Sequence, residues 1–212
     1  SLLFDPTRAS LHQTPEVAQL WHARARQRSK GLPEAPGDAL PTPTPKRAED
    51  SAVSVTYAFS TQEELVEQYT STFGSVRVGK VLEDLDALAG NVAFRHIDDE
   101  DPETCAPLIV TASIDRIKIS HRANLRDDII ANGRVTWVGR SSVELMMSLT
   151  SSWAQEPWLV AYFTFVARDP RDGRAVEVNP LRVDGDAEAT RLFELGEQRS
   201  RVKKELRTEL QR

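Results

Sequence analysis

Apolar residues recur at helical spacing between positions 78 and 93. At about 100° per residue they fall on one stripe, which comprises Val78, Val81, Leu82, Leu85, Leu88, Ala89 and Val92. This pattern predicts a long helix at Gly74 to Gly90 that is buried along the stripe. The opposite face is expected to be solvated, and it carries Lys80, Glu83, Asp84, Ala87 and Asn91.

A different pattern, the alternation of apolar and polar residues that is typical of half-buried strands, begins at Ala52. It predicts a first strand over 53–59. After the helix, four β-rich runs separated by turn or charged residues predict strands at 108–119, 129–138, 142–153 and 158–168. One strand, one long helix and four strands is the order expected when a curved antiparallel sheet wraps a single helix. The predicted fold class is therefore α+β.

The segments on either side of this region differ from it in composition. Seven of the twelve prolines fall within residues 1–50, which we interpret as an extension and linker. This extension includes a short helix capped by Thr14, which is either a surface helix or a remnant targeting or docking helix. We assign residues 51–185 to the main domain and the charged stretch 186–212 to a connector helix. Because the chain begins at Ser1, we expect a processed or trimmed protein.

Composition and charge exclude several classes of function. Lys and Arg total 27 against 32 Asp and Glu, so the net charge of -5 argues against a nucleic-acid partner. The apolar runs are shorter than the ~18 residues of a membrane span, so none is expected. Cys105 is the single cysteine, which excludes an internal disulfide and suits a reducing compartment.

The helix has an unusual flank, about 100° around from the apolar stripe. Gly79, Asp86, Gly90 and Ala93 share it, so one carboxylate stands among small residues. One interpretation is close packing of a strand, and the other is a ligand site. In the second case the backbone N–H groups of Val78 and Gly79 act as oxyanion donors at the positive end of the helix, and Asp86 acts as a base toward water.

At this point the sequence resembles a known family. The segment GSVRVGKVLEDLDALAG, residues 74–90, is similar to the start of the helix in mitochondrial acyl-CoA thioesterases of the two-hotdog type. Residues 135–144, 165–169 and 178–181 resemble later parts of the amino-terminal hotdog of that family, in the same order.

The resemblance implies a hotdog fold and the pairing of two hotdogs into one extended sheet, with active sites at their interface. It also implies that Asp86 is the acid of the hotdog helix and that Ser75 stands where related sequences carry an asparagine. A second hotdog is then required. A missing carboxy-terminal half, a second copy of this chain in a dimer or higher oligomer, or a separate chain would provide it.

Further candidates concern the substrate. Arg126, Arg140, Ser141 and Ser142 are candidates for contacts with coenzyme A, and the alternative is that the cations merely balance a nearby acidic surface. Coenzyme A is part of the substrate, so no separate cofactor is expected. His96 and His121 lack metal-ligand spacing, so no metal site is expected. A serine-hydrolase route is excluded in its usual form because G-x-S-x-G is absent.

The leading functional hypothesis is the hydrolysis of acyl-CoA to a free fatty acid and coenzyme A, in the mitochondrial matrix as the resemblance implies. A non-catalytic hotdog scaffold, or an acyl-CoA-binding interaction domain, is the alternative, and Ser75 is the residue that favours it. A hotdog hydratase is a third possibility, but the helix lacks the paired Asp and His or Asn and His that such chemistry needs.

Overall fold

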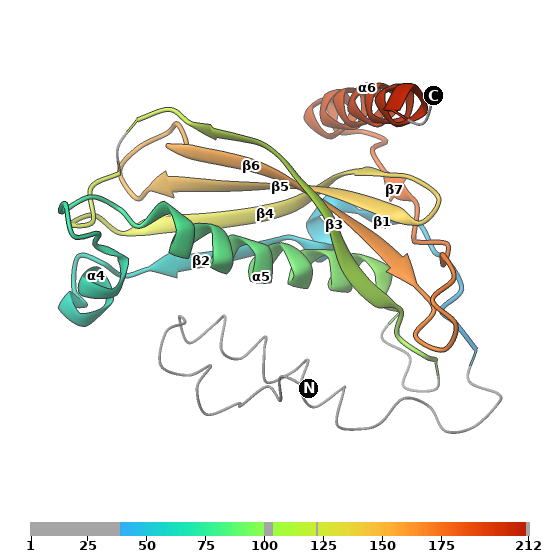
Figure 1. Cartoon of the computed structure of the whole chain (residues 1–212), viewed down its shortest axis with the longest axis horizontal. Coiled ribbons are helices and arrows are strands. Elements are labelled where there is room, and N and C mark those ends of the chain that lie inside the picture. Colours follow the sequence, from blue (N-terminus) through green and yellow to red (C-terminus); the bar gives the residue numbers. More distant parts are fainter. Residues whose placement is uncertain (1–38, 100–103, 122, 211–212) are drawn as a thin grey trace.

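The computed structural model describes residues 39–99, 104–121 and 123–210, so the predicted helix after Thr14 lies outside the described residues. Figure 1 shows the arrangement of the elements. In chain order they are β1 (Lys46–Arg47), α3 (Ala48–Ser51), β2 (Val53–Tyr57), α4 (Glu63–Tyr69), α5 (Val78–Ile97), β3 (Leu108–Ile119), β4 (Ile129–Val138), β5 (Ser142–Ser151), β6 (Leu159–Arg168), β7 (Leu181–Arg182) and α6 (Ala187–Leu210).

The main sheet has five strands in the order β2-β4-β5-β6-β3, and all of its pairings are antiparallel. Its strands agree with the five predicted ones, and only the outer residues of 53–59, 142–153 and 158–168 fall outside them. Side chains along β6 alternate between buried and half-buried. Consequently one face of the sheet supplies the core.

The helix α5 lies along the concave face of this sheet (Figure 1). Five residues of its apolar stripe are buried as predicted, with Leu85, Leu88 and Val92 completely covered, whereas the other two, Val78 and Leu82, are half-buried. The helix begins later than predicted, at Val78, because Gly74 has a φ of 72° and forms part of a turn. It also continues past the predicted end at Gly90, which is buried inside the helix, as far as Ile97.

The last residues of the predicted amino-terminal extension fold against the main domain. β1 pairs in parallel with β7, and α3 contacts α5. Asn179 connects these parts, because its Oδ1 accepts a hydrogen bond from the backbone N–H of Thr44 and its Nδ2 donates to the carbonyl of His96. The end of α5 is thereby fixed to segments from both ends of the described chain.

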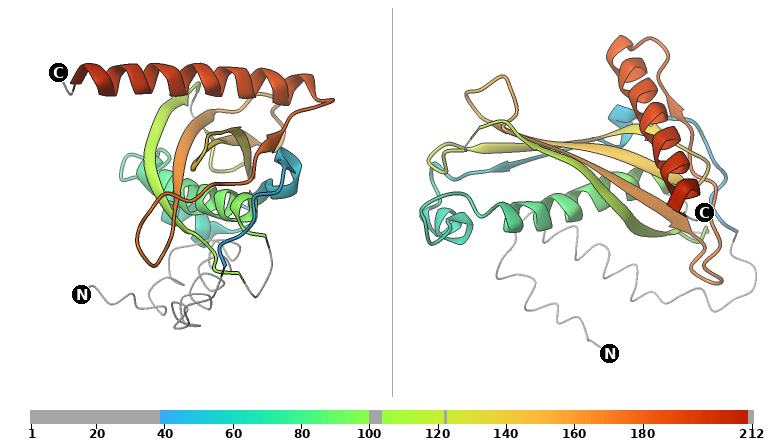
Figure 2. Two further views of the ribbon diagram at one scale, coloured as in Figure 1. Left: turned by 90° about the vertical axis from the view of Figure 1, so that its right-hand side faces the viewer. Right: turned by 45° about the horizontal axis from the view of Figure 1, so that its top comes forward.

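The helix α6 crosses the opposite, convex face of the sheet (Figure 2). It agrees with the connector helix predicted at 186–212. Gly196 sits directly against Trp137 of β4, where a Cβ on the glycine would clash with the indole. The sheet is therefore covered by one helix on each face. Within the part of the chain that the structure describes, no helix is long and apolar enough to cross a bilayer.

Candidate functional site

Asp86 lies half-buried on α5, on the side that faces the edge strand β3. The hydroxyl of Thr111 on β3 donates a hydrogen bond to Oδ1 of Asp86 over 3.2 Å. The carboxylate is therefore held in position by the strand and still accessible from solvent. The structure thus keeps the predicted base near the surface, and it adds Thr111, which sequence reasoning did not identify.

The strand that carries Thr111 forms one edge of the sheet. Among the described strands, β3 pairs with β6 alone. Its apolar side chains are unusually exposed, with relative accessibilities of 42–49% for Leu108, Val110, Ile114, Ile117 and Ile119. An exposed apolar edge of this length presents unpaired backbone groups and is a ready site for another strand.

The turn before α5 holds Ser75. Ser71 accepts hydrogen bonds at its Oγ from the backbone N–H groups of Phe73 and Ser75, at 3.3 and 3.2 Å. The two serine hydroxyls also contact each other over 2.8 Å, and Gly74 supplies the left-handed residue that closes the turn. The predicted site residue Ser75 is therefore exposed at the surface and engaged with Ser71.

The two predicted oxyanion donors differ in availability. The N–H of Val78 already donates to the carbonyl of Val76, over 3.0 Å. By contrast, the N–H of Gly79 has no hydrogen-bond partner among the described residues, as expected for the second residue of a helix. A cavity of about 510 Å³ opens beside it, lined by Gln68, Arg77, Gly79, Lys80 and Glu83. Gly79 is thus the better donor of the two.

The separation of Gly79 from Asp86 limits what one chain can do. Seven residues along a helix correspond to about 10 Å at 1.5 Å per residue. A thioester carbonyl that is contacted by the N–H of Gly79 is therefore out of reach of Asp86 on the same helix. The predicted donor and the predicted base of one chain therefore do not meet at the same reacting atom.

A second carboxylate of α5, Asp84, is buried, and this corrects the expectation that it is solvated. Only 3% of the residue is exposed, and its Oδ2 accepts hydrogen bonds from the hydroxyls of Tyr57, at 3.3 Å, and Tyr69. Burial raises the pKa of Asp84, although the hydrogen bond from Tyr69 acts in the opposite direction. Burial and the nearby Asp84 charge also raise the pKa of Tyr69. The cluster fixes α4 and β2 to the start of α5.

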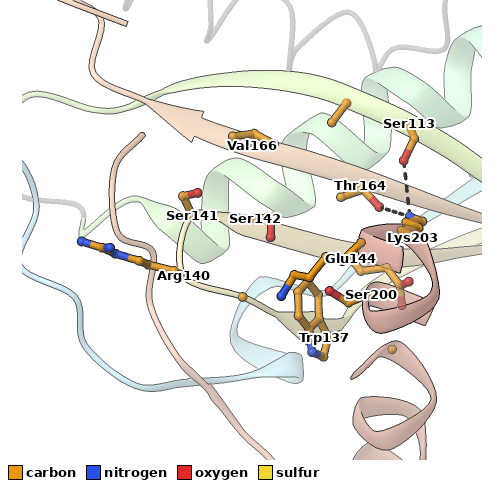
Figure 3. Close-up of a pocket in the computed structure, with 14 residues that line it drawn as sticks. Ser113, Trp137, Arg140, Ser141, Ser142, Glu144, Thr164, Val166, Ser200 and Lys203 are labelled. Atoms are coloured by element: carbon orange, nitrogen blue, oxygen red, sulfur yellow. Dashed lines mark hydrogen bonds between the residues drawn. The ribbon is translucent and has the colours of Figure 1, made fainter. Parts of the chain in front are cut away.

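The four residues predicted to contact coenzyme A do not all lie in the same place. Arg140, Ser141 and Ser142 lie together at the β4–β5 hairpin and line a cavity of about 290 Å³ between the sheet and α6 (Figure 3). Arg126, in contrast, precedes β4 and lies at the far end of that ten-residue strand, about 30 Å away at the rise of a β-strand. Three of the four residues are thus brought together.

The histidines do not form a metal site in the described part of the chain, where no group of three or more His, Cys, Asp or Glu is placed to hold an ion. His96 is buried, with its Nε2 2.9 Å from the carbonyl of Asn179 and its Nδ1 3.5 Å from the hydroxyl of Ser51. Burial lowers the pKa of His96 to about 4. The ring is therefore a neutral structural group, and His121 is exposed.

Comparison with known proteins gives related sequences, although no family model matches the chain. Acyl-coenzyme A thioesterase 2, chloroplastic, of Humulus lupulus is 37% identical over 213 residues, which cover 95% of this chain and 48% of that protein. Acyl-coenzyme A thioesterase 9, mitochondrial, of Mus musculus is 31% identical over 196 residues, covering 90% of this chain and 44% of that protein. The chain therefore spans about half the length of these relatives, or less.

Solved structures with the same fold include two acyl-CoA hydrolases. The acyl-CoA hydrolase from Staphylococcus aureus superposes with a TM-score of 0.65 at 20% identity, over 79% of this chain and 93% of that one. An apo-hexameric acyl-CoA thioesterase has a TM-score of 0.63 at 25% identity, over 76% of this chain and 96% of that one. Together with the related sequences, these matches show that the chain is a hotdog-fold homologue of the acyl-CoA thioesterases. In particular it resembles acyl-coenzyme A thioesterase 9.

Proposed function

We propose that the protein hydrolyses acyl-CoA thioesters to a free fatty acid and coenzyme A, as one half of a two-hotdog catalytic unit. The observation that carries this proposal is the carboxylate of Asp86, which Thr111 holds at an open flank of α5 beside the edge strand. The homologous proteins named as acyl-CoA thioesterases support the same chemistry.

The proposed reaction needs a base and an oxyanion donor. Asp86 accepts a proton from water as the water oxygen attacks the thioester carbonyl carbon, and a backbone N–H such as that of Gly79 donates to the developing oxyanion. The carbon–sulfur bond then breaks, and the proton returns from Asp86 to the departing coenzyme A sulfur. Thr111 keeps Oδ1 oriented, which leaves Oδ2 for the water.

A second hotdog completes this site in our proposal. Because Gly79 and Asp86 of one helix are about 10 Å apart, the donor that serves Asp86 comes from the turn before the helix of the second domain. The exposed apolar edge of β3 is the surface where that domain would pair. The hexameric assembly of the structurally similar thioesterase supports an oligomer of hotdogs.

The residue types of the site also agree with those altered in a similar structure. The solved structures of the staphylococcal acyl-CoA hydrolase include variants in which a threonine, an aspartate or an asparagine is replaced by alanine. In this chain a threonine and an aspartate, Thr111 and Asp86, are in contact, whereas Ser71 and Ser75 occupy the turn. In our proposal the missing asparagine is supplied by the second hotdog.

The location of the protein is also a proposal. Relatives include mitochondrial proteins and one chloroplastic protein. The mitochondrial matrix that the sequence resemblance implied is supported by the mitochondrial thioesterase 9 of Mus musculus and Homo sapiens.

The test is the release of free thiol from acyl-CoA substrates of graded chain length. The protein is assayed in the assembly that a solution mass measurement identifies as containing at least two hotdogs. We expect Asp86→Ala to lower kcat at least about 100-fold, because a positioned general base contributes 10² to 10⁴ in rate. Glu177→Gln, which removes an exposed acid that is not part of the proposed site, is the control and should retain the parent rate.

Two results would contradict the proposal. One is an Asp86→Ala variant that is as fast as the parent, and the other is a paired assembly that releases no thiol from any chain length. The second result would favour a scaffold that binds acyl-CoA without turnover. The serine pair in the turn before α5 supports this alternative, because it places two engaged hydroxyls where an amide would hold water.

A further inference from the structure

Asp84 is a buried carboxylate that the proposed hydrolysis does not use. It lies on α5 two residues before Asp86, and only 3% of it is exposed. Burying a carboxylate is costly unless other groups pair with it. Apolar residues of similar volume often give equal or greater stability at such a position. Stability alone therefore does not account for an aspartate here.

The closest partner of Asp84 is Tyr69, the last residue of α4. The Tyr69 hydroxyl donates a hydrogen bond to Oδ2 of Asp84, and Nζ of Lys80 lies 4.8 Å from the centre of the Tyr69 ring. Tyr69 is 1% exposed, so its side chain is enclosed by the protein. A hydrogen bond has a preferred direction, whereas apolar burial has none. This contact therefore fixes the end of α4 relative to α5.

The backbone of Tyr69 holds the turn before α5. Its carbonyl accepts a hydrogen bond from the N–H of Arg77 over 2.8 Å, and the next residue, Thr70, forms a β-bridge with Val76. Both contacts join the end of α4 to the residues that directly precede α5. Tyr69 thus binds the turn through its backbone and Asp84 through its side chain. Residues 69–84 consequently form a closed loop.

Gly79 lies inside this closed loop, and its N–H is the donor proposed for the developing oxyanion. It has no side chain to fix its position, and a Cβ added there would meet nothing within 4 Å. The direction of its N–H therefore depends on the residues on either side, which Tyr69 and Asp84 hold. An oxyanion donor acts at about 2.7–3.1 Å from the developing charge. A small rotation of the first turn of α5 is enough to lose that contact.

We propose that Tyr69 and Asp84 are a positioning pair that orients the N–H of Gly79 toward the thioester carbonyl. This inference rests on the proposed hydrolysis and assigns two further residues to it. The pair acts through the backbone of the turn and not by contact with the substrate. Tyr57 donates to the same carboxylate over 3.3 Å, but it lies on β2, outside the closed loop. It contributes to the burial of Asp84, whereas Tyr69 closes the loop.

The test compares Tyr69→Phe with Tyr57→Phe in the assembly used for thiol release. Each variant removes one hydroxyl from Asp84 and keeps the aromatic ring. We expect Tyr69→Phe to lower kcat about tenfold with KM within about twofold of the parent, because the donor acts on the transition state and is misaligned but not removed. Tyr57→Phe, the matched control, should keep kcat within about twofold. Urea unfolding establishes that both variants are folded under the assay conditions.

A double variant separates positioning from stability. Tyr69→Phe, Asp84→Leu replaces the pair with apolar groups, so it should recover most of the stability that Tyr69→Phe loses. Its kcat should nevertheless remain as low as that of Tyr69→Phe, because the directional contact is still missing. A purely structural role predicts that kcat recovers together with stability.

Amide hydrogen exchange gives a second measurement that needs no turnover. We expect exchange at residues 70–79 to be at least about tenfold faster in Tyr69→Phe, as the turn loosens, but not in Tyr57→Phe. Parent-like kcat or exchange in Tyr69→Phe, equal losses in the two single variants, or recovery of kcat in the double variant would overturn the positioning role. The proposed hydrolysis fails separately, if Asp86→Ala is as fast as the parent, and the exchange comparison then still decides whether Tyr69 orders the turn.

Discussion

The two long helices lie on opposite faces of one sheet, yet they are held to it by different interactions. On the concave face, α5 presents Leu85, Leu88 and Val92, which are completely buried against apolar residues of the strands. On the convex face, α6 is held by the Glu144–Arg199 and Lys203–Asp115 ion pairs and by the hydrogen bond between Trp137 and Glu197. The concave helix is therefore held mainly by apolar burial, whereas the convex helix adds matched charges to the burial of Leu192 and Trp137.

The largest effect should come from the apolar side. Leu88→Ala removes a side chain that is fully buried, and we expect it to lower the free energy of unfolding by about 4 kcal/mol, through lost transfer energy and the cavity left behind. Urea unfolding followed by circular dichroism measures this change. Leu206→Ala on α6, where 52% of the residue is exposed, is the control and should change stability by less than about 0.5 kcal/mol. Similar losses in both variants would remove the distinction between the helices.

On the convex face, substitutions in the ion pair between Glu144 and Arg199 should have a different effect on stability. Arg199→Leu leaves the carboxylate of Glu144, which is 3% exposed, without its partner. We expect a loss of about 3 kcal/mol, since removal of one member of a buried pair is strongly destabilising. The double variant Glu144→Leu, Arg199→Leu should recover most of this loss, because an apolar pair replaces the ion pair.

Hydrogen exchange of the amides in α6 locates the effect. Faster exchange confined to α6 in Arg199→Leu would show that the helix detaches while the sheet and α5 stay folded. Arg201→Leu, which breaks the exposed pair with Glu197, is the matched control and should be nearly neutral. A double variant that is as unstable as Arg199→Leu would mean that apolar packing, and not the charge pair, holds α6.

The difference between local sequence patterns and long-range pairings explains how much of the fold was predictable. The four strands after α5 are marked by β-rich runs between turn or charged residues, and the stripe of α5 by helical spacing, so both follow from the sequence alone. The short elements α4, β1 and β7 are not marked in this way. β1 and β7 form through a pairing between residues 46–47 and 181–182, which no local pattern encodes.

The candidate site was predictable to a smaller degree. Asp86 could be identified because small residues surround it on one helix. Thr111 could not, since its contact with Asp86 joins two elements that are 25 residues apart. Asp84 was placed on the wrong face because helical periodicity counts only the apolar stripe, whereas Tyr57 and Tyr69 from other elements cover that position. The cavity beside the β4–β5 hairpin likewise forms only through the tertiary packing of α6.

A smaller effect is that the two faces of the sheet contribute to the free energy of unfolding with a different dependence on pH. His96, at the end of α5, has an ordinary pKa of 6.5, which burial lowers to about 4 in the folded protein. Between these values the unfolded chain binds the extra proton, so the free energy of unfolding falls as the pH falls. On the convex side, burial acts to raise the pKa of Asp115, but hydrogen bonds from Lys203 and Ser113 outweigh it and lower the pKa. The stability from that pair is lost only at lower pH.

We therefore expect His96 to account for a loss of about 2 kcal/mol between pH 7 and pH 5. Urea unfolding at a series of pH values, for the parent and for His96→Gln, measures this contribution as the difference between the two profiles. Asp84, whose raised pKa makes the protein more stable as the pH falls, contributes equally to both profiles and cancels. Parallel profiles from pH 7 to pH 5 would show that His96 is not the titrating group, and a difference that grows only below pH 4 would assign the acid sensitivity to the carboxylates that hold α6.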